Sequence, residues 1–400
     1  MKKRKERHKR NYLAGLLTFW MFSLGVLIIF LLYVTKEYRV LDASVKQLKT
    51  EVNSEERKKQ KETETHILET TQSETSEVEE TEAETENNRE DISLIFGGDL
   101  LLSGAILRQY DNNGGIQGLI EEPLLSELVN ADISMVNQEF PFSERGTPME
   151  GKEYTFQTPP SRINILEELG IDIVSLANNH TLDYGREALL DTFKTLEDSG
   201  ISYVGAGENL DRAKQMEVIE IANTRVGFLS ASRVIPVASW NASNSLSGIF
   251  TTYSADAMLK EIEEARELCD LLIVYVHWGV EFEERPASYQ VKMAKAYIES
   301  GADMVIGSHP HVVQGVEYHL GKPIIYSLGN FIFGNTIKEG MLLKADYTKD
   351  NLLLISIIPF TSPKFQLQEM VIQEKSDFFQ YIEDISYGIE VDYRGIIREK

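Results

Sequence analysis

The sequence predicts a mixed α/β fold in which helices are layered on sheets. From Asp91 onward, short apolar runs alternate with longer amphipathic segments, the pattern of strands followed by helices. Polar residues that can bind ligands follow several of the apolar runs, where α/β proteins collect their sites. Beyond Gly340 the pattern becomes mostly strand-like. These three observations favour packed α and β layers.

The apolar runs are the expected strands, and the amphipathic segments are the expected helices. We expect strands at 92–97, 133–137, 172–176, 225–230, 271–277, 303–307 and 323–327. We expect helices over about 121–129, 161–169, 186–199, 255–268 and 287–300. Further strand-like stretches are LLLISIIPF and FQLQEMVI, and a terminal helix is expected near 375–388. The chain shows no internal repeat, so we expect one core-bearing domain over residues 91–400.

The N-terminal part of the chain has the composition of a membrane anchor. Leu13–Val34 is an uncharged apolar run, long enough to cross a hydrocarbon core of roughly 30 Å as a helix. The basic cluster MKKRKERHKR before it predicts a cytoplasmic N-terminus. A secretory signal peptide is the alternative, but its apolar region is usually about 7 to 15 residues long and no small-x-small cleavage site follows. We therefore expect a cytoplasmic tail at 1–10 and an uncleaved signal anchor at 11–35, in a single-pass protein of the cell membrane.

Residues 36–90 are expected to be a stalk and a tether outside the cytoplasm. Apolar residues lie on one helical stripe at Leu41, Val45, Leu48 and Val52. This stripe either pairs weakly with a second copy or forms a solitary helix, because one or two heptads do not specify a coiled coil. Residues 60–90 are rich in Glu and Thr and almost lack large apolar side chains, so we expect a disordered, self-repelling tether.

Charge and cysteine content restrict the partners and the sources of stability. Of the formal net charge of −23, the first 90 residues contribute only −1, so residues 91–400 carry −22. Such a domain repels polyanions unless metal ions or a local basic pocket reverse the field, so nucleic acid is not an expected partner. Cys269 is the only cysteine, which excludes a disulfide within the chain. Its apolar neighbours indicate a buried residue rather than a nucleophile.

Five expected strands end in carboxylate, amide or imidazole groups. In chain order these are Asp99, Asn137 with Glu139, Asn178 with Asn179 and His180, His277, and His309 with His311. Oxygen and imidazole donors together suit borderline divalent ions such as Mn, Zn or Fe. Each residue alone is weak evidence for a site, because an Asp at a strand end often caps a helix and a lone His is often structural. Together they favour a metal or catalytic site over scattered structural histidines.

Six segments, in order, resemble the motif series of the CapA family of capsule and poly-gamma-glutamate synthesis proteins. They are GGDLLLSG, VNQEFPFS, SLANNHTLDYG, VHWGVEFEERP, GADMVIGSHPHVVQGVE and KPIIYSLGNFIFG. The resemblance runs from about Ile92 to Gly334. That family is similar to the calcineurin-like metallophosphoesterases, which implies a four-layer α/β/β/α sandwich and often two metal ions.

The resemblance also implies roles for the strand-end residues. The implied metal ligands are Asp99, Glu139, Asn179, His277, His309 and His311, with Glu139 at the bridging position. Asp99 and His180 are the implied catalytic residues, and His180 would protonate the leaving group or stabilise the phosphoryl group. The first motif departs from the superfamily pattern Asp-x-His, because Leu101 stands where a histidine is expected. One metal ion would then lose a ligand, so either one ion or two is expected.

A second set of residues is expected to contact substrate. It comprises Asn137, Asn178, Asp183, Glu281, Arg285 and Asn330. Glu281 and Arg285 are four residues apart, so a surface salt bridge is an equal alternative for them. Asn330 either lines the site or caps a turn.

Three functional hypotheses follow from the sequence. The first is a metal-dependent, phosphoesterase-like hydrolase of capsule or poly-gamma-glutamate synthesis and export. The second is a non-catalytic assembly or anchoring component that contacts the subunits of an anionic-polymer synthetase. The third is a hydrolase whose substrate is a wall glycopolymer or a peptide-like amide. In each, the N-terminal helix is expected to bind the lipid bilayer.

Overall fold

The computed structural model describes residues 90–334 and 336–400. The expected cytoplasmic tail, signal anchor, stalk and tether belong to the residues before Glu90 and lie outside the described residues. Within the two described stretches, no helix combines the length and the apolar character needed to span a bilayer.

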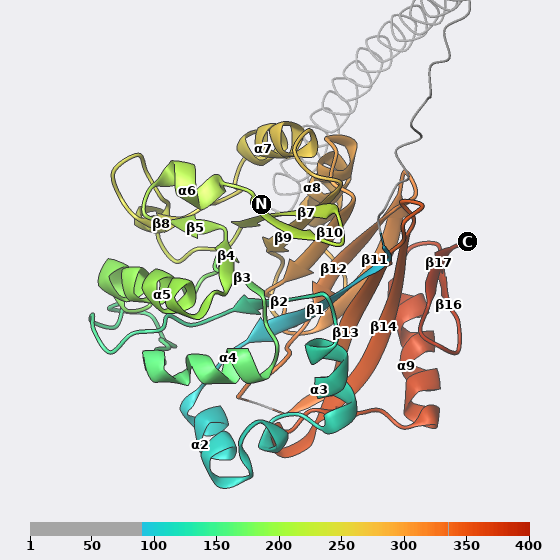
Figure 1. Cartoon of the computed structure of the whole chain (residues 1–400), viewed down its shortest axis with the longest axis horizontal. Helices are drawn as coiled ribbons and strands as arrows, with labels where there is room; N and C mark the ends of the chain where they lie inside the picture. Colours follow the sequence, from blue (N-terminus) through green and yellow to red (C-terminus); the bar gives the residue numbers. More distant parts are fainter. Residues whose placement is uncertain (1–89, 335) are drawn as a thin grey trace, which may run out of the picture. The chain divides into compact units, whose positions relative to one another are not determined.

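Two large sheets organise the described residues (Figure 1). The first sheet has the order β15-β14-β13-β1-β2-β3-β4, with β1 Ile92–Leu100, β2 Ile133–Gln138, β3 Ile173–Ser175, β4 Ser202–Val204, β13 Ile337–Tyr347, β14 Leu353–Ser362 and β15 Gln368–Glu369. The second sheet has the order β11-β12-β10-β9-β7-β6, with β6 Glu217–Ile221, β7 Thr224–Ser232, β9 Leu271–His277, β10 Met304–Ser308, β11 Val313–His319 and β12 Lys322–Leu328. Two small pairs join β5 Ala206–Gly207 to β8 Gly248–Ile249 and β16 Ile389–Val391 to β17 Ile397–Glu399.

Strand direction gives each sheet one edge rich in carboxyl ends. In the first sheet, β1, β2, β3 and β4 are parallel, and β13 runs antiparallel to β1. In the second sheet, β7, β9, β10 and β12 are parallel, while the outer strands β6 and β11 are antiparallel to their neighbours. Residues that follow parallel strands therefore meet at a common edge of each sheet.

The core lies between the sheets and on both of their outer faces. Phe96 of β1 and Tyr275 of β9 belong to one central cluster, so the two sheets share it. Their chain neighbours Ile95 and Val274 point the other way, because successive strand side chains alternate between faces. Ile95 packs in a cluster with buried residues of helices α3 Glu122–Val129, α4 Asn164–Glu168 and α5 Gly185–Ser199. Val274 packs with α7 Asp256–Arg266 and α8 Ser288–Glu299, so helices cover the outer face of each sheet (Figure 1).

The remaining helices lie around this arrangement. They are α2 Gly104–Asn112, α6 Leu210–Lys214 and α9 Ile372–Ile385, together with short 3-10 turns at Gly115–Gly118, Pro160–Ile163, Ala238–Trp240 and Pro363–Phe365. Helix α9 buries Phe378, Phe379, Ile382 and Ile385 in the central cluster. Cys269 is buried, as its apolar neighbours indicated.

The mixed α/β prediction is confirmed, and the seven strands expected before Gly340 are all present. The strand expected at FQLQEMVI is present but shorter than expected, because only Gln368–Glu369 pairs in the sheet. The chain turns into α9 directly afterwards, where the Glu374 side chain accepts a hydrogen bond from the Val371 amide at 3.0 Å. The terminal helix consequently starts and ends about three residues earlier than expected. The expected helix at 161–169 begins as a 3-10 turn at Pro160–Ile163.

Candidate metal centre

Strand ends from both sheets meet in one buried cluster of polar side chains. Asp99 ends β1, Asn137 and Glu139 lie at the end of β2, and His277 ends β9. All four are fully buried. A buried charged side chain normally requires an oppositely charged or hydrogen-bonding partner. Ligand atoms of Asp99, Glu139 and His277 lie within 4.8 Å of one another. These three residues, called the inner group below, combine two carboxylates with an imidazole.

Asn137 holds the inner group together. Its Nδ2 donates to Asp99 Oδ1 at 2.8 Å and lies 3.4 Å from Glu139 Oε1 and 3.2 Å from His277 Nδ1. Glu139 Oε1 is also 3.3 Å from His277 Nε2. The second carboxylate oxygen, Glu139 Oε2, is buried without a hydrogen-bond partner among the described residues. An orphaned buried oxygen beside a second carboxylate and an imidazole fits a divalent cation, which would satisfy it.

The backbone at Asp99 is fixed by the loop after β12. The Asp99 amide donates to the Gly329 carbonyl at 2.9 Å, and the Phe331 amide donates to the Asp99 carbonyl at 2.9 Å. This contact requires Gly98, because a Cβ there would lie 1.9 Å from the Gly329 oxygen. The same contact places Asn330 beside the cluster, where its Oδ1 is 2.8 Å from His311 Nδ1.

His309 and His311 reach the cluster from the loop after β10. The His309 amide donates to Asp99 Oδ2 at 3.2 Å, and His311 Nδ1 lies 3.2 Å from the same oxygen. Both residues have positive φ, 97° for His309 and 58° for His311, conformations that cost about 1–3 kcal/mol outside glycine. Strain of this kind persists where the surrounding structure imposes it, as it does at binding sites.

Asn179 and His180 extend the cluster beyond the inner group. Asn179 Oδ1 lies 2.9 Å from His277 Nε2. His180 Nδ1 lies 2.8 Å from Asp183 Oδ2, and the His180 amide donates to Asn178 Oδ1 at 3.0 Å. The contact with Asp183 orients the imidazole and leaves Nε2 as the nitrogen that can exchange a proton with a ligand.

Burial and charge set the protonation of the cluster. Burial, followed by the charge of Asp99, raises the pKa of Glu139 well above its usual range. Burial also lowers the pKa of His277 well below its usual value, lowers that of His180, and brings that of His309 to about 4. For His311, burial acts in the same direction, but the hydrogen bond to Asp99 and the charge of Glu139 outweigh it and raise the pKa to about 10. Contact with Asp99 and Glu139 thus favours the protonated form of His311, whereas burial favours the neutral forms of the other three histidines.

The structure brings together all but one of the residues singled out from the sequence. Glu281 is exposed, and its carboxylate lies within 4.8 Å of ligand atoms of His309 and His311. Arg285 joins none of these contacts, and its Nη2 donates instead to the Asp384 carbonyl at 3.4 Å. No ion pair links Arg285 to Glu281 within residues 90–334 and 336–400. Leu101 is buried in the apolar core and offers no ligand atom.

Sequence reasoning missed Lys152. Its Nζ contacts the Asn179 carbonyl and Asp183 Oδ1, and lies 3.1 Å from His180 Nδ1. Burial lowers the pKa of Lys152, and the charge of Asp183 opposes this shift. Lys152 lies in an irregular segment far from any strand end, so the rule that identified the other residues could not find it. Ser308, whose Oγ is 3.1 Å from His277 Nδ1, was also missed.

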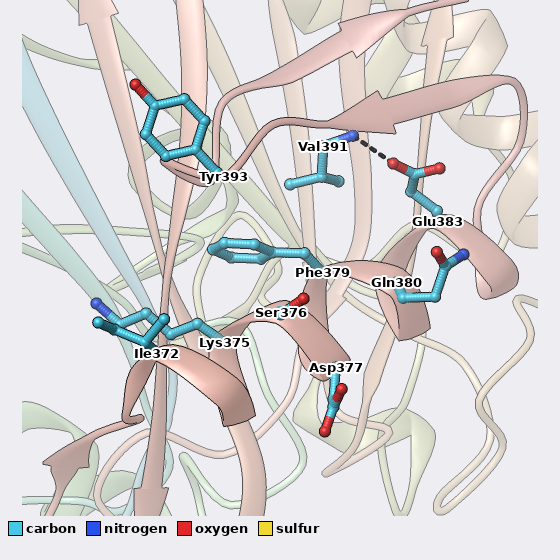
Figure 2. A pocket seen from close by; sticks show the side chains of 9 residues that line it. All are labelled: Ile372, Lys375, Ser376, Asp377, Phe379, Gln380, Glu383, Val391 and Tyr393. Atoms are coloured by element: carbon cyan, nitrogen blue, oxygen red, sulfur yellow. Dashed lines mark hydrogen bonds between the residues drawn. The ribbon is translucent and has the colours of Figure 1, made fainter.

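A cavity of about 270 Å³ adjoins His311 and Asn330. Its other lining side chains combine aromatic, acidic and basic groups and include Phe282, Glu284, Lys338, Glu339 and Tyr381. A larger groove of about 800 Å³ lies along α9 and beside Val391 and Tyr393 (Figure 2). None of the residues predicted for the site lines this groove. Of these two hollows, the smaller cavity is the one lined by residues predicted for the site.

Together, the fold and this cluster define an α/β protein with a carboxylate–imidazole centre of the kind that holds borderline divalent cations. The strand-end motifs that build the centre also identify the family. The chain belongs to the bacterial capsule synthesis protein family PGA_cap, whose model matches residues 93–335.

Two relatives of the chain have descriptions that agree with this family. The capsule biosynthesis protein CapA of Bacillus anthracis is 30% identical over 267 residues, a match that covers 63% of this chain and 60% of that protein. A probable polyglutamine synthesis accessory protein of Mycobacterium tuberculosis is 27% identical over 282 residues, covering 65% of this chain and 74% of that protein. Superposed on this chain, the solved structure of Haemophilus influenzae NAD nucleotidase gives a TM-score of 0.41 and a sequence identity of 11%. The match covers 74% of this chain and 63% of the nucleotidase chain.

Proposed function

We propose that this chain is a metal-dependent, phosphoesterase-like hydrolase that takes part in the synthesis or export of an anionic capsular polymer. The inner group carries the proposal, because it gathers two carboxylates and an imidazole and leaves Glu139 Oε2 without a hydrogen-bond partner in the described part of the chain. We further propose that the apolar run Leu13–Val34 anchors the chain in the cell membrane and holds residues 91–400 outside the cytoplasm. The part in polymer synthesis is supported by the descriptions of its relatives as capsule biosynthesis and polyglutamine synthesis proteins.

The residues of the site have two proposed roles, binding the ion and transferring a proton. Asp99, Glu139 and His277 would hold the ion, with Asn179 beside them. A divalent cation at this position would supply Lewis-acid polarisation of the phosphoryl group. His180 follows Asn179 directly, and its Nδ1 lies 2.8 Å from Asp183 Oδ2 and 3.1 Å from Lys152 Nζ. It is therefore the residue placed to donate a proton to the leaving oxygen.

The activity is tested with the purified full-length chain in detergent, a chromogenic phosphodiester and added Mn²⁺. We expect turnover that a chelator abolishes and that His180→Ala lowers by about 10²- to 10⁴-fold, without loss of bound metal. The matched control is His319→Ala, because His319 lies outside the cluster and pairs with Glu299 at the surface. Absence of turnover with every divalent ion tried, together with absence of bound metal, would contradict the proposal.

A second function is favoured by the description of the Mycobacterium tuberculosis relative as an accessory protein. In this alternative the chain contacts the subunits of an anionic-polymer synthetase and organises assembly or anchoring without catalysis. Surface polymer would then remain in cells that carry His180→Ala and His309→Ala variants, and deletion of residues 1–35 would abolish it. Loss of polymer in the histidine variants, with normal amounts of protein, would reject this alternative.

A further inference from the structure

Arg233 is a cation without an ionic partner at the edge of the metal centre. It follows β7 directly, and its Nε is buried without a hydrogen-bond partner among the described residues. Within residues 90–334 and 336–400, no carboxylate forms an ion pair with its guanidinium. By contrast Arg225, near the other end of the same strand, pairs with Asp270 at 3.3 Å. An unsatisfied buried donor is an exception in a native fold, and a bound ion or ligand can account for it.

Two tyrosine rings hold the guanidinium group of Arg233. Its Cζ lies 4.6 Å from the ring centroid of Tyr253 and 5.2 Å from that of Tyr289. A guanidinium that lies over an aromatic face keeps the N–H groups at its edge for an oxyanion, which it can bind with two parallel hydrogen bonds. Because the rings restrict the side chain beforehand, less rotamer freedom is lost when an anion binds.

Backbone contacts fix the segment that carries the arginine. The Arg233 amide donates to the His277 carbonyl at 2.8 Å. Two residues further on, the Ile235 amide donates to the Tyr253 hydroxyl at 3.3 Å. The segment is therefore tied both to β9 and to one of the two rings that hold the guanidinium.

The same contacts place Arg233 beside the metal centre. It directly follows the residue of β7 that pairs with His277 of β9. The hydroxyl of Tyr289 accepts a hydrogen bond from the Gly279 amide at 2.7 Å. A Cβ at Gly279 would lie 2.8 Å from Pro310 Cγ, so this glycine packs against the His-Pro-His segment. The arginine and its rings thus share the carboxyl-end edge of the second sheet with the ligand histidines.

The segment that begins with Arg233 also reaches the other side of the centre. It leads into the 3-10 turn Ala238–Trp240. The ring of Trp240 has its centroid 5.2 Å from Lys152 Nζ, which lies 3.1 Å from His180 Nδ1. A chain-like substrate whose reacting group lies at the centre would therefore have this segment, and its cation, alongside it.

We propose that Arg233, held by Tyr253 and Tyr289, is an oxyanion-binding subsite that takes a carboxylate or phosphate group of the substrate next to the group placed at the metal centre. This inference rests on the proposed function and deepens it by naming the substrate class, a chain with repeated anionic groups instead of an isolated phosphoester. The net charge of −22 over residues 91–400 repels such a chain. A cation that no internal carboxylate neutralises offsets this repulsion where the substrate meets the protein.

The test is calorimetric titration of the full-length chain in detergent, loaded with Mn²⁺ and freed of excess ion by gel filtration. The probes are a short γ-linked glutamate oligomer, a glycerol phosphate oligomer of equal charge, and the glutamate oligomer with its carboxylates amidated. We expect the wild-type chain to bind at least one anionic oligomer and not the amidated one. The anionic oligomer that binds more tightly identifies the group that Arg233 takes. Arg233→Gln should bind it about 10- to 100-fold more weakly, because a charge-assisted contact is lost.

The matched control is Arg225→Gln, which removes the same charge from the opposite end of β7. It should bind the anionic oligomers as the wild-type chain does. Arg233→Lys keeps the charge and loses the planar fork, so its affinity should lie between those of the wild-type chain and Arg233→Gln. If Arg233→Gln does not fold, the comparison rests on Arg233→Lys and on the amidated oligomer. Thermal unfolding of every variant separates a folding defect from a binding defect.

Three results would overturn the subsite: wild-type affinity in the Arg233 variants, equal binding of the amidated oligomer, or no binding of either anionic oligomer to the wild-type chain. A purely structural Arg233 would give the first of these together with a lower unfolding temperature. If the wild-type chain still hydrolyses the chromogenic phosphodiester, these results leave the proposed function standing. Absence of bound Mn²⁺ and of turnover in the wild-type chain would instead contradict the proposed function.

Discussion

At the scale of single residues, Glu139 is the side chain whose ionisation depends most on whether a cation is bound. Both its oxygens are buried, one of them has no hydrogen-bond partner within residues 90–334 and 336–400, and the Asp99 carboxylate is close by. Without a cation, these surroundings penalise the ionised form, which is why the pKa of Glu139 is raised. With a cation, the same carboxylate becomes a ligand. On the proposed function, Glu139 would therefore be costly to the metal-free protein and required for binding the ion.

Replacing Glu139 by Gln should stabilise the metal-free chain and abolish its response to metal. We expect a gain of about 1–3 kcal/mol in the free energy of unfolding in chelator, the typical cost of an unsatisfied buried polar group. Because the pKa is raised above 4.5, folding favours the protonated form, and the wild-type chain loses stability as pH rises above that value. The gain should thus be small at pH 4 and larger at pH 8. Thermal unfolding with and without Mn²⁺ measures both effects.

The opposite result for Glu139→Gln would contradict this account of the inner group. A metal-free variant less stable than the wild-type chain at pH 8, and still stabilised by Mn²⁺ to the same extent, would show that Glu139 is a structural residue. Ser376→Ala is a suitable control, because Ser376 lies on α9 beside the separate groove (Figure 2).

Membership of the site could be predicted from the sequence for residues that follow a parallel strand, but not for residues elsewhere. Asp99, His277 and His309 each follow a run of apolar residues, so the rule for strand ends applies to them. Lys152 follows no strand and reaches the cluster only because the chain folds back on itself. Arg285 has a position in sequence much like that of Glu281, yet its side chain contacts α9. The spacing of residues in the sequence does not show in which direction each of these two side chains points.

At the scale of elements, the centre depends on the contact between β1 and the loop after β12. Strand β1 passes so close to this loop that only glycine fits at position 98. The resulting pair of hydrogen bonds fixes the Asp99 backbone and aligns Asn330 with His311. Loss of this contact would move Asp99 of the inner group and the Asn330 side chain that contacts His311.

Gly98→Ala should therefore reduce stability and metal binding together. The added Cβ would lie 1.9 Å from the Gly329 oxygen, so the backbone must shift, at a cost of about 1–3 kcal/mol. Gly104→Ala is the matched control, because its nearest neighbour is the flexible end of Arg108 at 3.4 Å and alanine favours helix α2. Denaturant unfolding and Mn²⁺ titration measure the outcome. Wild-type stability and affinity in Gly98→Ala would contradict the role given to this contact.

The long, wholly buried strands followed from the sequence, and two partly exposed strands did not. Strands β1, β2, β9 and β10 are almost wholly buried, so they appear as continuous apolar runs. Strand β6 has no fully buried residue, and the end of β11 is partly exposed, so both escaped prediction. Their pairing depends on neighbours distant in sequence, and local patterns do not carry that information.

At the scale of the whole molecule, the arrangement of two facing sheets is what makes the centre. The first sheet supplies the carboxylates Asp99 and Glu139, and the second supplies His277, His309 and His311. Neither sheet holds a complete ligand set, so the centre forms only when the two pack together. The net charge of −22 over residues 91–400 raises the local concentration of cations around this centre.

The most direct test of this account is the position of a metal ion in a crystal of the protein grown with Mn²⁺. Anomalous scattering should show an ion within about 2.5 Å of Asp99, Glu139 and His277, bound by strand ends of both sheets. An ion bound elsewhere, or no anomalous peak at the inner group under saturating Mn²⁺, would contradict the claim that these strand ends build a metal centre.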